Sequence, residues 1–555
     1  MTMYPLFSKD KFANVGPRQE SLYIGLLGLL LFTFGLWNQP FVGFDARFAL
    51  FAQEMWRHGP SLFPTTYGEP YPDYPSTSTV LIWLVSHPFG TVTKLSAVLP
   101  TALAAALNLT ITYRLLASFS RQWAILAVGF EILTVTFLAE ARSISLDQMV
   151  ATVTLLSFYL TYTGCRDQQP ARLRWLPVLL IAGFAIRGPL GAVIPAGVVC
   201  SYYLLSAQWH RLLVFAATAA LVLAVCWAVL LGAADHFYGG DFARDVIHMQ
   251  VTGRVEASEH PQHWYYLTSS FGNYALAYPV AMMAVLLLTT TQLNFFGNPP
   301  HDDTRYFLIF LIGWVLVVIV GLSIPDAKKA RYLLPIVPAI AALAAYPLRA
   351  DDEVRKQRAL HFFAMVMERL FLILPLLVMI GVAFANRYAH KDAAQPQLSF
   401  PLIFVLLVCY QTVALVVQQR AKNASRTTGL LLVAVLTVWT VNSLIVEPVG
   451  LQLHDTRKFV QKVEALRQQR QGDISFFRVG KDAAAIKYLV NLDYDLRPYF
   501  FSESAAVDAY RGGASYLIVE DDQLAALRAS ARVAPLKPVL HHRFDHHFYS
   551  VFYLE

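Results

Sequence analysis

Long apolar runs divide this chain almost from end to end, and they constrain its fold more than any other feature. A helix needs roughly 17–25 mostly apolar residues to cross a bilayer. The composition agrees, with 56% hydrophobic and only 15% charged residues and a mean hydropathy of +0.46, which excludes an ordinary soluble protein. We predict about thirteen transmembrane helices, at residues 21–38, 95–117, 122–140, 143–164, 174–187, 189–208, 210–233, 271–292, 306–323, 331–348, 368–388, 401–420 and 427–446.

The basic residues orient these spans. Lys9, Lys11 and Arg18 precede the first run, and no cleavage pattern follows it, so we predict a retained anchor with a cytoplasmic N-terminus. An odd number of spans then places residues 447–555 outside. Several basic connections, such as 349–358 and 420–426, fall on the cytoplasmic side, as the positive-inside rule requires.

Three outer segments are longer than connectors need to be, at 39–94, 233–270 and 447–555. The last one alternates helical with strand-like stretches, so we predict a small α/β domain at 447–555 behind a transmembrane domain at 1–446. The net charge of +7 is spread over both sides of the membrane, which argues against a nucleic-acid partner. The four cysteines show no CxxC spacing, and we expect free thiols.

Charged residues gather at the outer ends of the spans. The stretch "FDARFALFAQEMWRHG" carries Asp45, Arg47 and Glu54 directly after the first run. Asp45 alone could mark a helix start, and we expect it to be an exposed carboxylate that contributes little to stability. Further polar groups stand among aromatic residues in "GEPYPDYPS", "EARSISLDQM", "HMQVTGRVEASEHPQHWYYL" and "SIPDAKKARYLLPIVP".

Each of these segments has a structural and a functional interpretation. Asp147 lies a few residues inside an apolar run, where a carboxylate is costly unless it faces a partner or a cavity, and Arg142 is a candidate structural partner. The histidine-bearing segment 248–267 holds either a divalent metal or a solvated cluster without one. The basic residues Lys328, Lys329 and Arg331 suit either lipid headgroups or a specific phosphate.

In this order, the outer motifs resemble those of the membrane glycosyltransferases of the GT-C superfamily. The closest likeness is to the lipid A aminoarabinose transferases and the bacterial protein O-mannosyltransferase-like proteins. It covers residues 20–345 and rests on the acidic motif at Asp45, "DYP", "ARSISLD", "RGPLGAVIP", the loop ending "WYYL", and "KKARYLLPIVP".

Two motifs depart from the family pattern. The family has an adjacent Asp-Glu pair, whereas this chain has one carboxylate, and Asp45 matches either its first or its second position. The family's Glu-Lys-Pro-Pro is replaced by Asp73, Tyr74, Pro75 and Ser76, which lack the basic residue. These departures leave the acceptor open among lipid A, another envelope glycan or lipid, and protein.

The resemblance implies an inverting transfer of a sugar from a polyprenyl-phosphate donor on the outer face of a bacterial inner membrane. It also implies that the enzyme is a monomer, that its C-terminal domain is periplasmic, and that it requires no cofactor. A divalent metal at His260, Glu256 and Asp73 stays an open alternative, as do a lipid-linked-sugar flippase and a non-catalytic scaffold. The implied roles are catalysis for Asp45, Asp73 and Asp147, phosphate binding for Arg47, Lys328, Lys329 and Arg331, and cavity lining for Arg142, Arg187, His260 and Tyr332.

Overall fold

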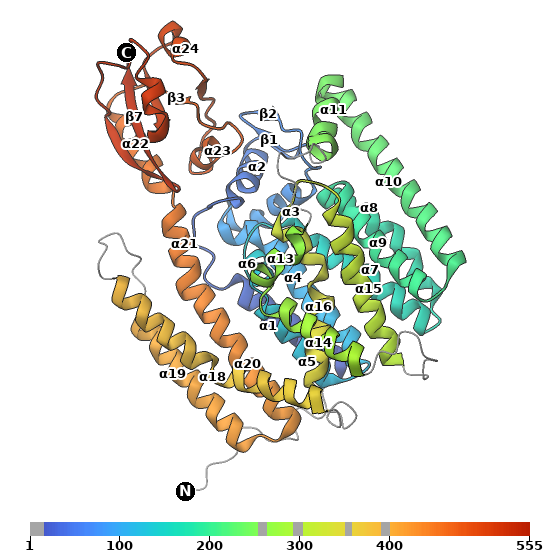
Figure 1. Ribbon diagram of the computed structural model, residues 1–555. Helices are drawn as coiled ribbons and strands as arrows, with labels where there is room; N and C mark the ends of the chain where they lie inside the picture. The colour runs from blue at the N-terminus through green and yellow to red at the C-terminus, as the bar shows by residue number, and fades with distance from the viewer. Residues whose placement is uncertain (1–15, 254–263, 292–302, 350–357, 390–399) are drawn as a thin grey trace. The chain divides into compact units, whose positions relative to one another are not determined.

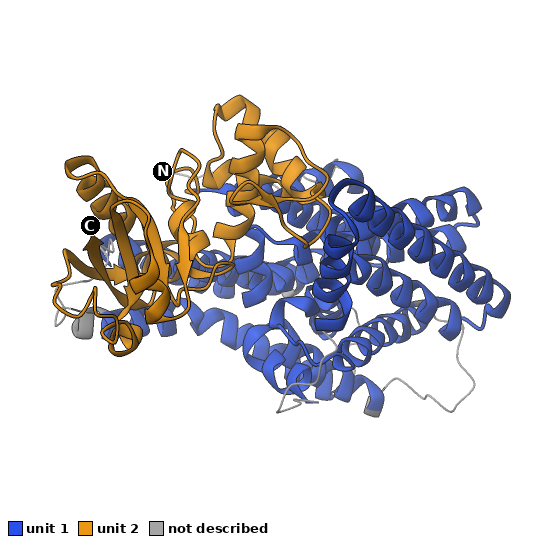
Figure 2. Ribbon diagram, turned by 90° about the horizontal axis from the view of Figure 1, so that it is seen from above, with its two compact units in different colours: residues 1–34, 101–395, 399–442 blue, residues 35–100, 396–398, 443–555 orange. Residues whose placement is uncertain are grey.

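The computed structural model describes residues 16–253, 264–291, 303–349, 358–389 and 400–555 (Figure 1). The chain forms two compact units (Figure 2). The first consists of the described parts of 1–34, 101–395 and 399–442, and the second contains 35–100 and 443–555. Segment 39–94 therefore belongs to the same unit as the C-terminal region.

The first unit is helical, because its apolar runs satisfy their backbone hydrogen bonds internally. Within the described residues every predicted run falls on a helix. The helices are α1 (Pro17–Thr33), α4 (Lys94–Ala117, which starts in the second unit), α5 (Arg121–Leu133), α6 (Val135–Ala141), α7 (Leu146–Arg166), α8 (Leu176–Arg187), α9 (Pro189–Leu205), α10 (Trp209–Tyr238), α11 (Gly240–Ile247), α13 (Tyr265–Asn273), α14 (Ala277–Thr291), α15 (Asp303–Ser323), α16 (Val337–Ala345), α18 (Arg358–Ala389), α19 (Phe400–Arg420) and α20 (Asn423–Val441).

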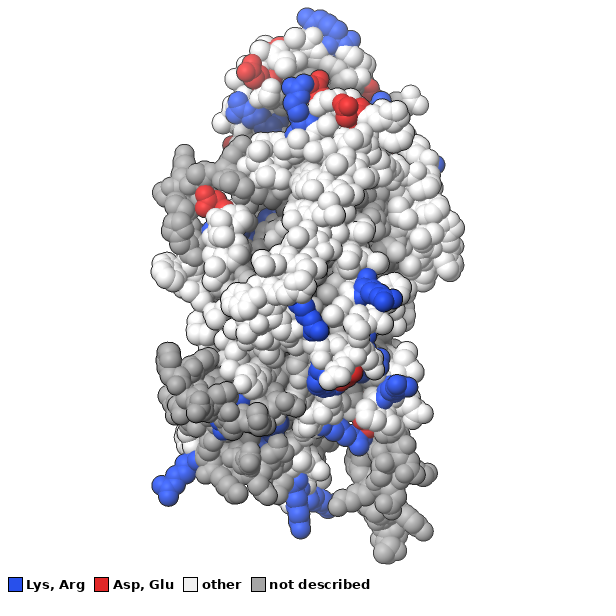
Figure 3. Space-filling model, turned by 90° about the vertical axis from the view of Figure 1, so that its right-hand side faces the viewer, with Lys and Arg blue, Asp and Glu red and all other residues white. Residues whose placement is uncertain are grey.

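By length and composition, seven helices among the described residues can cross a membrane, or up to nine if each bent pair is one span. The chain is therefore a multi-pass membrane protein, and the count of about thirteen spans stays a prediction. Helix α10 leaves large apolar side chains exposed, as expected for a surface that lipid covers; they include Leu213, Leu221, Val225 and Val229. Figure 3 shows wide areas of surface without charged side chains.

Two predicted spans are broken. Helices α5 and α6 meet at 75°, and α13 and α14 meet at 114°. The two breaks hydrogen-bond to each other, since the Val135 amide donates to the Ala275 carbonyl (2.8 Å) and the Thr136 hydroxyl donates to the Asn273 carbonyl (2.6 Å). Each break thus satisfies backbone groups that the other leaves open. The single spans expected at 122–140 and 271–292 stay predictions, and each of these runs contains a sharp break.

The second unit joins a small helical layer to a sheet. Its first part holds α2 (Asp45–His58), the hairpin of β1 (Thr65–Thr66) and β2 (Glu69–Pro70), and α3 (Thr77–Ser86). Its second part holds α21 (Glu447–His454), α22 (Arg457–Gln469), β3 (Asp473–Phe477), α23 (Ala484–Leu489), β4 (Tyr499–Phe501), α24 (Ser504–Ala509), β5 (Ser515–Glu520), α25 (Leu524–Leu527), β6 (Leu540–Phe544) and β7 (His547–Leu554).

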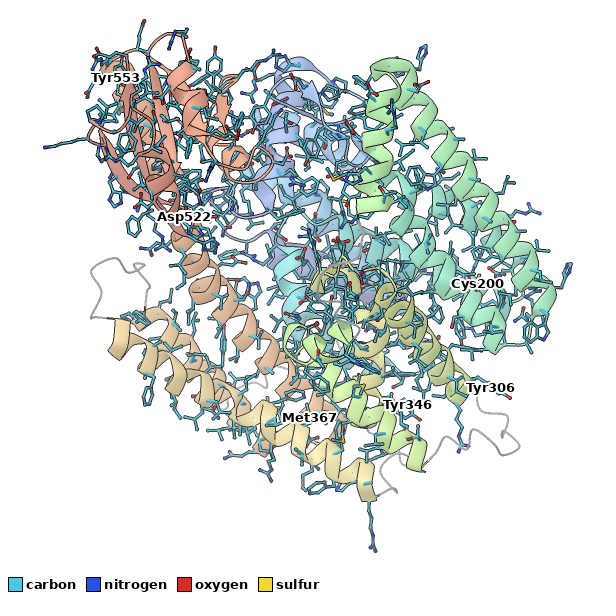
Figure 4. All side chains as sticks on the ribbon, turned by 45° about the horizontal axis from the view of Figure 1, so that its top comes forward. Cys200, Tyr306, Tyr346, Met367, Asp522 and Tyr553 are labelled. Carbon is cyan, nitrogen blue, oxygen red and sulfur yellow. The ribbon has the colours of Figure 1, made fainter. Side chains whose placement is uncertain are left out.

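These strands form one mixed sheet in the order β4-β3-β5-β7-β6. Strand β3 is parallel to β4 and β5, and β7 is antiparallel to β5 and β6. The inner strands are nearly continuous apolar runs because both faces are covered, and Phe477, Leu517, Val519 and Phe552 form the centre of a buried cluster. Asp522 and Tyr553 mark this sheet region in Figure 4.

The four thiols are free, as predicted. Cys200 lies on α9 in the helical unit (Figure 4), Cys165 and Cys226 are half-buried there as well, and Cys409 is exposed on α19.

Candidate active site

Asp45 is the first residue of α2 and is buried, with only 6% of its surface exposed. Its Oδ2 accepts a hydrogen bond from the Nζ atom of Lys94, which is the first residue of α4 and is also buried. An aspartate at a helix N-terminus interacts favourably with the helix dipole, and the ammonium adds a full opposite charge. The expectation of an exposed loop carboxylate is therefore wrong, because its partner lies 49 residues away in the sequence.

Arg47 lies two residues further along the same helix and contacts the C-terminal part of the unit. Its Nη2 donates to the carbonyl of Asp482 (2.9 Å), and its guanidinium lies 5.5 Å from the ring centres of both Phe44 and Tyr71. Burial raises the pKa of Tyr71 to about 12, although the nearby Arg47 charge opposes this rise. The aromatic rings fix the plane of the guanidinium, whose five donors allow it to bind an anion as well.

Glu54 has a structural role at the other end of α2. Its buried carboxylate accepts hydrogen bonds from the backbone amides of Tyr67 (2.8 Å) and Gly68 (3.4 Å). These residues form the two-residue turn between β1 and β2, and both have positive φ, at 59° and 72°. The carboxylate thus holds the hairpin that leads into the "PYPDYPS" segment, where Asp73 is also buried.

In the first unit, a carboxylate and two arginines form a compact charged cluster. Asp147 lies in the first turn of α7, and the Ser145 side chain caps that helix by accepting from the Gln148 amide. The Arg187 guanidinium contacts both oxygens of Asp147, at 2.8 and 3.3 Å, and Arg331 Nε lies 3.1 Å from Oδ2. These three side chains contribute one negative and two positive charges.

Glycine positions Arg187. This residue ends α8, and Gly188 follows in the left-handed region with φ of 63° before α9 begins at Pro189. At the same corner Gly183 and Gly191 lie so close that a Cβ on either would fall 2.0 or 1.9 Å from the other's carbonyl oxygen. The "RGPLGAVIP" segment therefore turns the chain sharply and directs the guanidinium at Asp147.

The basic segment 328–332 adds to the positive charge of this unit. The Lys328 side chain is only 4% exposed, and its Nζ donates to the Pro325 carbonyl (3.0 Å) and lies 4.0 Å from Asp326. Lys329 is exposed. Tyr332 is buried, and the Arg187 guanidinium lies 5.3 Å from its ring centre. The predicted residues Asp147, Arg187, Arg331 and Tyr332 are thus brought together.

Other predicted residues have different surroundings. Arg142 is buried and donates to the carbonyls of Leu31 (2.7 Å) and Phe34 (2.9 Å) at the end of α1, while Arg187 and Arg331 provide ion pairs to Asp147. His260 and Glu256 lie outside the described residues, and so does the predicted metal set that needs them. Sequence reasoning missed Lys94, whose one signal is that it is a basic residue directly before an apolar run.

Comparisons with known proteins agree with the resemblance. The family model of dolichyl-phosphate-mannose-protein mannosyltransferases matches residues 73–231. A search of curated proteins by sequence finds no match. Among solved structures, ArnT from Cupriavidus metallidurans bound to undecaprenyl phosphate has a TM-score of 0.67 at 15% identity and covers 96% of this chain and 97% of that chain.

Two further structures are similar. The apo state of the same ArnT has a TM-score of 0.66 at 15% identity, with the same coverage of 96% and 97%. The archaeal oligosaccharyltransferase AglB from Archaeoglobus fulgidus, in complex with an inhibitory peptide and a dolichol-phosphate, has a TM-score of 0.46 at 12% identity and covers 92% of this chain and 71% of that chain. The chain has the fold of ArnT, and its resemblance to the membrane glycosyltransferases of the GT-C superfamily is confirmed.

Proposed function

We propose that this protein transfers a sugar from a polyprenyl-phosphate donor to an acceptor at the outer face of the membrane. The observation that carries the proposal is the cluster of Asp147, Arg187 and Arg331, with the Lys328 ammonium in the same unit. Charged groups at the ends of apolar helices mark functional sites more often than structural ones, and guanidinium groups bind phosphate well.

The proposed reaction is an inverting displacement. The acceptor hydroxyl oxygen forms a bond to the anomeric carbon, and the bond between that carbon and the phosphate oxygen breaks, so polyprenyl phosphate leaves with the electron pair. Positive charge develops on the sugar and negative charge on the phosphate, so a carboxylate and cations are needed on opposite sides. Asp45 takes the acceptor proton, Asp73 and Asp147 orient the sugar, and Arg331, Lys328, Lys329 and Arg47 stabilise the phosphate.

Lys94 supports the assignment of Asp45 to this role. The family's Glu-Lys-Pro-Pro motif contributes a lysine that the Asp73-Tyr74-Pro75-Ser76 sequence lacks. Lys94 supplies an ammonium in the same unit and holds the Asp45 carboxylate by a hydrogen bond. We propose that Lys94 supplies the positive charge that the lysine of the family motif provides in other members.

The acceptor proposed is lipid A or another envelope lipid or glycan, with protein as the alternative within the same family. The protein is proposed to act as a monomer in the bacterial inner membrane, with 447–555 in the periplasm, where nucleotide sugars are not supplied. A flippase is less well supported, although it would also use broken helices. The breaks in α5/α6 and α13/α14 hydrogen-bond to each other's backbone, so these groups already have partners within the protein.

The test offers purified protein either polyprenyl-phosphate sugar or nucleotide sugar with an envelope extract as acceptor. We expect transfer from the lipid-linked donor, and transfer from the nucleotide sugar alone would refute the proposal. Lys328→Ala combined with Arg331→Ala should raise the KM for the donor at least tenfold, since each charge-assisted hydrogen bond contributes about 1.5–3 kcal/mol. Arg420→Ala with Lys422→Ala, a basic pair assigned to the cytoplasmic side, is the matched control.

A further inference from the structure

A group of two histidines and an aspartate lies in the second unit, in the region of the C-terminal sheet. His454 is the last residue of α21, whereas Asp545 and His546 form the two-residue loop between β6 and β7, in which Phe544 pairs with His547. One ligand atom from each side chain lies within 4.8 Å of the other two. The helix α21 and strand β7 that carry or border the group are labelled in Figure 1.

The three side chains converge on one oxygen atom. Oδ1 of Asp545 lies 2.8 Å from Nδ1 of His454 and 3.8 Å from Nε2 of His546. The two imidazole rings are 3.9 Å apart between centres and nearly perpendicular, at 86°. In a tetrahedral zinc site with bonds of about 2.0–2.2 Å, the ligand atoms are roughly 3.3–3.5 Å apart. Small side-chain rotations would therefore bring the three ligand atoms to the distances of a tetrahedral zinc site.

Lys487 leaves this oxygen available. Its Nζ donates to the other oxygen of Asp545, Oδ2, at 2.5 Å. Metal-binding side chains are commonly oriented by a second hydrogen-bonding partner of this kind. The lysine thus fixes the carboxylate plane, so that Oδ1 points towards the histidines.

The turn chemistry does not explain why these residues are present. Two-residue hairpin loops favour Asn-Gly, Asp-Gly or glycine at the first position. Here Asp545 has a φ of 58° and is followed by histidine, although the side chain of Asp545 is only 11% exposed. A buried carboxylate and a histidine at these two positions suit ligand binding better than they suit the turn.

We propose that His454, Asp545 and His546 bind a divalent transition metal of the Zn²⁺ class, with water as the fourth ligand. Imidazole and carboxylate ligands in this number suit zinc. The metal would join the end of α21 to the β6–β7 hairpin and so hold the short connection at 455–456 between α21 and α22. This site is separate from the proposed glycosyltransferase chemistry and concerns the stability of the C-terminal region.

The experiment uses the full-length protein in detergent, without a histidine tag, stripped with EDTA and titrated with ZnCl₂ by calorimetry. We expect one equivalent to bind with a Kd in the micromolar range or below. We also expect it to raise the thermal unfolding midpoint. His454→Ala, His546→Ala and Asp545→Asn should each weaken binding more than tenfold, the last while keeping the size of the side chain. His541→Ala is the control, because His541 lies on β6 and pairs with Asp521 instead.

Unfolding midpoints in EDTA show whether each variant still folds. Co²⁺ provides a second readout, since a tetrahedral site gives strong visible absorption that the three variants should lack and His541→Ala should keep. Zn²⁺ binding that is equal in the wild type and in His454→Ala would overturn the proposal. So would the absence of any binding to the wild type.

Discussion

Replacing Lys94 by methionine tests whether the pair with Asp45 is a buried ion pair. The substitution keeps most of the side-chain volume and removes the ammonium that hydrogen-bonds to Asp45. Both residues are at least 94% buried, so the relevant figure is the cost of removing one partner of a buried pair, about 3–5 kcal/mol. An exposed pair would cost only about 0–1 kcal/mol.

The assay is thermal unfolding of the purified protein in detergent. For a cooperative unit of about 150–250 residues, 1 kcal/mol shifts the midpoint by about 2–4 °C, so we expect Lys94→Met to lower it by roughly 6–20 °C. Lys481→Met is the matched control, since its pair with Glu69 is exposed on both sides and lies in the same unit; it should shift the midpoint by less than about 4 °C.

The double variant Asp45→Asn/Lys94→Met removes both charges. It should recover most of the lost stability, because neither an unpaired carboxylate nor an unpaired ammonium remains buried. It should nevertheless transfer no sugar if Asp45 takes the acceptor proton. If Lys94→Met and Asp45→Asn alone each shift the midpoint no more than the control and their effects add, the pair contributes little and this reasoning is refuted.

Two further perturbations test the elements that position the site. Gly191→Ala should destabilise the α8–α9 corner by about 1–3 kcal/mol or more, because its Cβ would fall 1.9 Å from the Gly183 carbonyl oxygen. Gly197→Ala on the same helix, where the nearest atom is 3.7 Å away, should be tolerated in the same unfolding assay. Glu54→Ala should cost about 1–3 kcal/mol by removing the acceptor of the Tyr67 amide and should speed proteolysis within 65–70. Glu54→Gln, which keeps an acceptor oxygen, should cost less, and equal costs would contradict this role.

The sequence predicts the helices well, because an apolar run inside a membrane has few alternatives to a helix. It does not predict the breaks at Thr134 and at 274–276, since no proline lies there and the breaks depend on pairing between segments far apart in the sequence. The sequence also gives little indication of strands β4 and β6. The first has three residues, and the second reads "LHHRF", without the alternation that marks a strand.

For the candidate site, the sequence likewise predicts which residues take part but not how they pair. Residue type and order identify Asp147, Arg187 and Arg331 as candidates, whereas their pairing is set by the α8–α9 corner and by the segment after α15. Asp45 is predicted as a candidate but its burial is not, since that depends on Lys94 at the start of another helix. A single lysine without a motif carries too little information to be singled out.

The end of α1 has a consequence for how the protein is made. The Leu31 carbonyl accepts hydrogen bonds from Arg142 (2.7 Å) and from the indole nitrogen of Trp439 on α20 (3.0 Å), which is 408 residues further along the chain. At a synthesis rate of about 5–20 residues per second, the tryptophan leaves the ribosome roughly 20–80 s after the helix that it completes. During that interval the Leu31 carbonyl lacks the indole donor that it has in the folded chain, so we expect the nascent chain to be most open to misassembly or to insertase binding before α20 arrives.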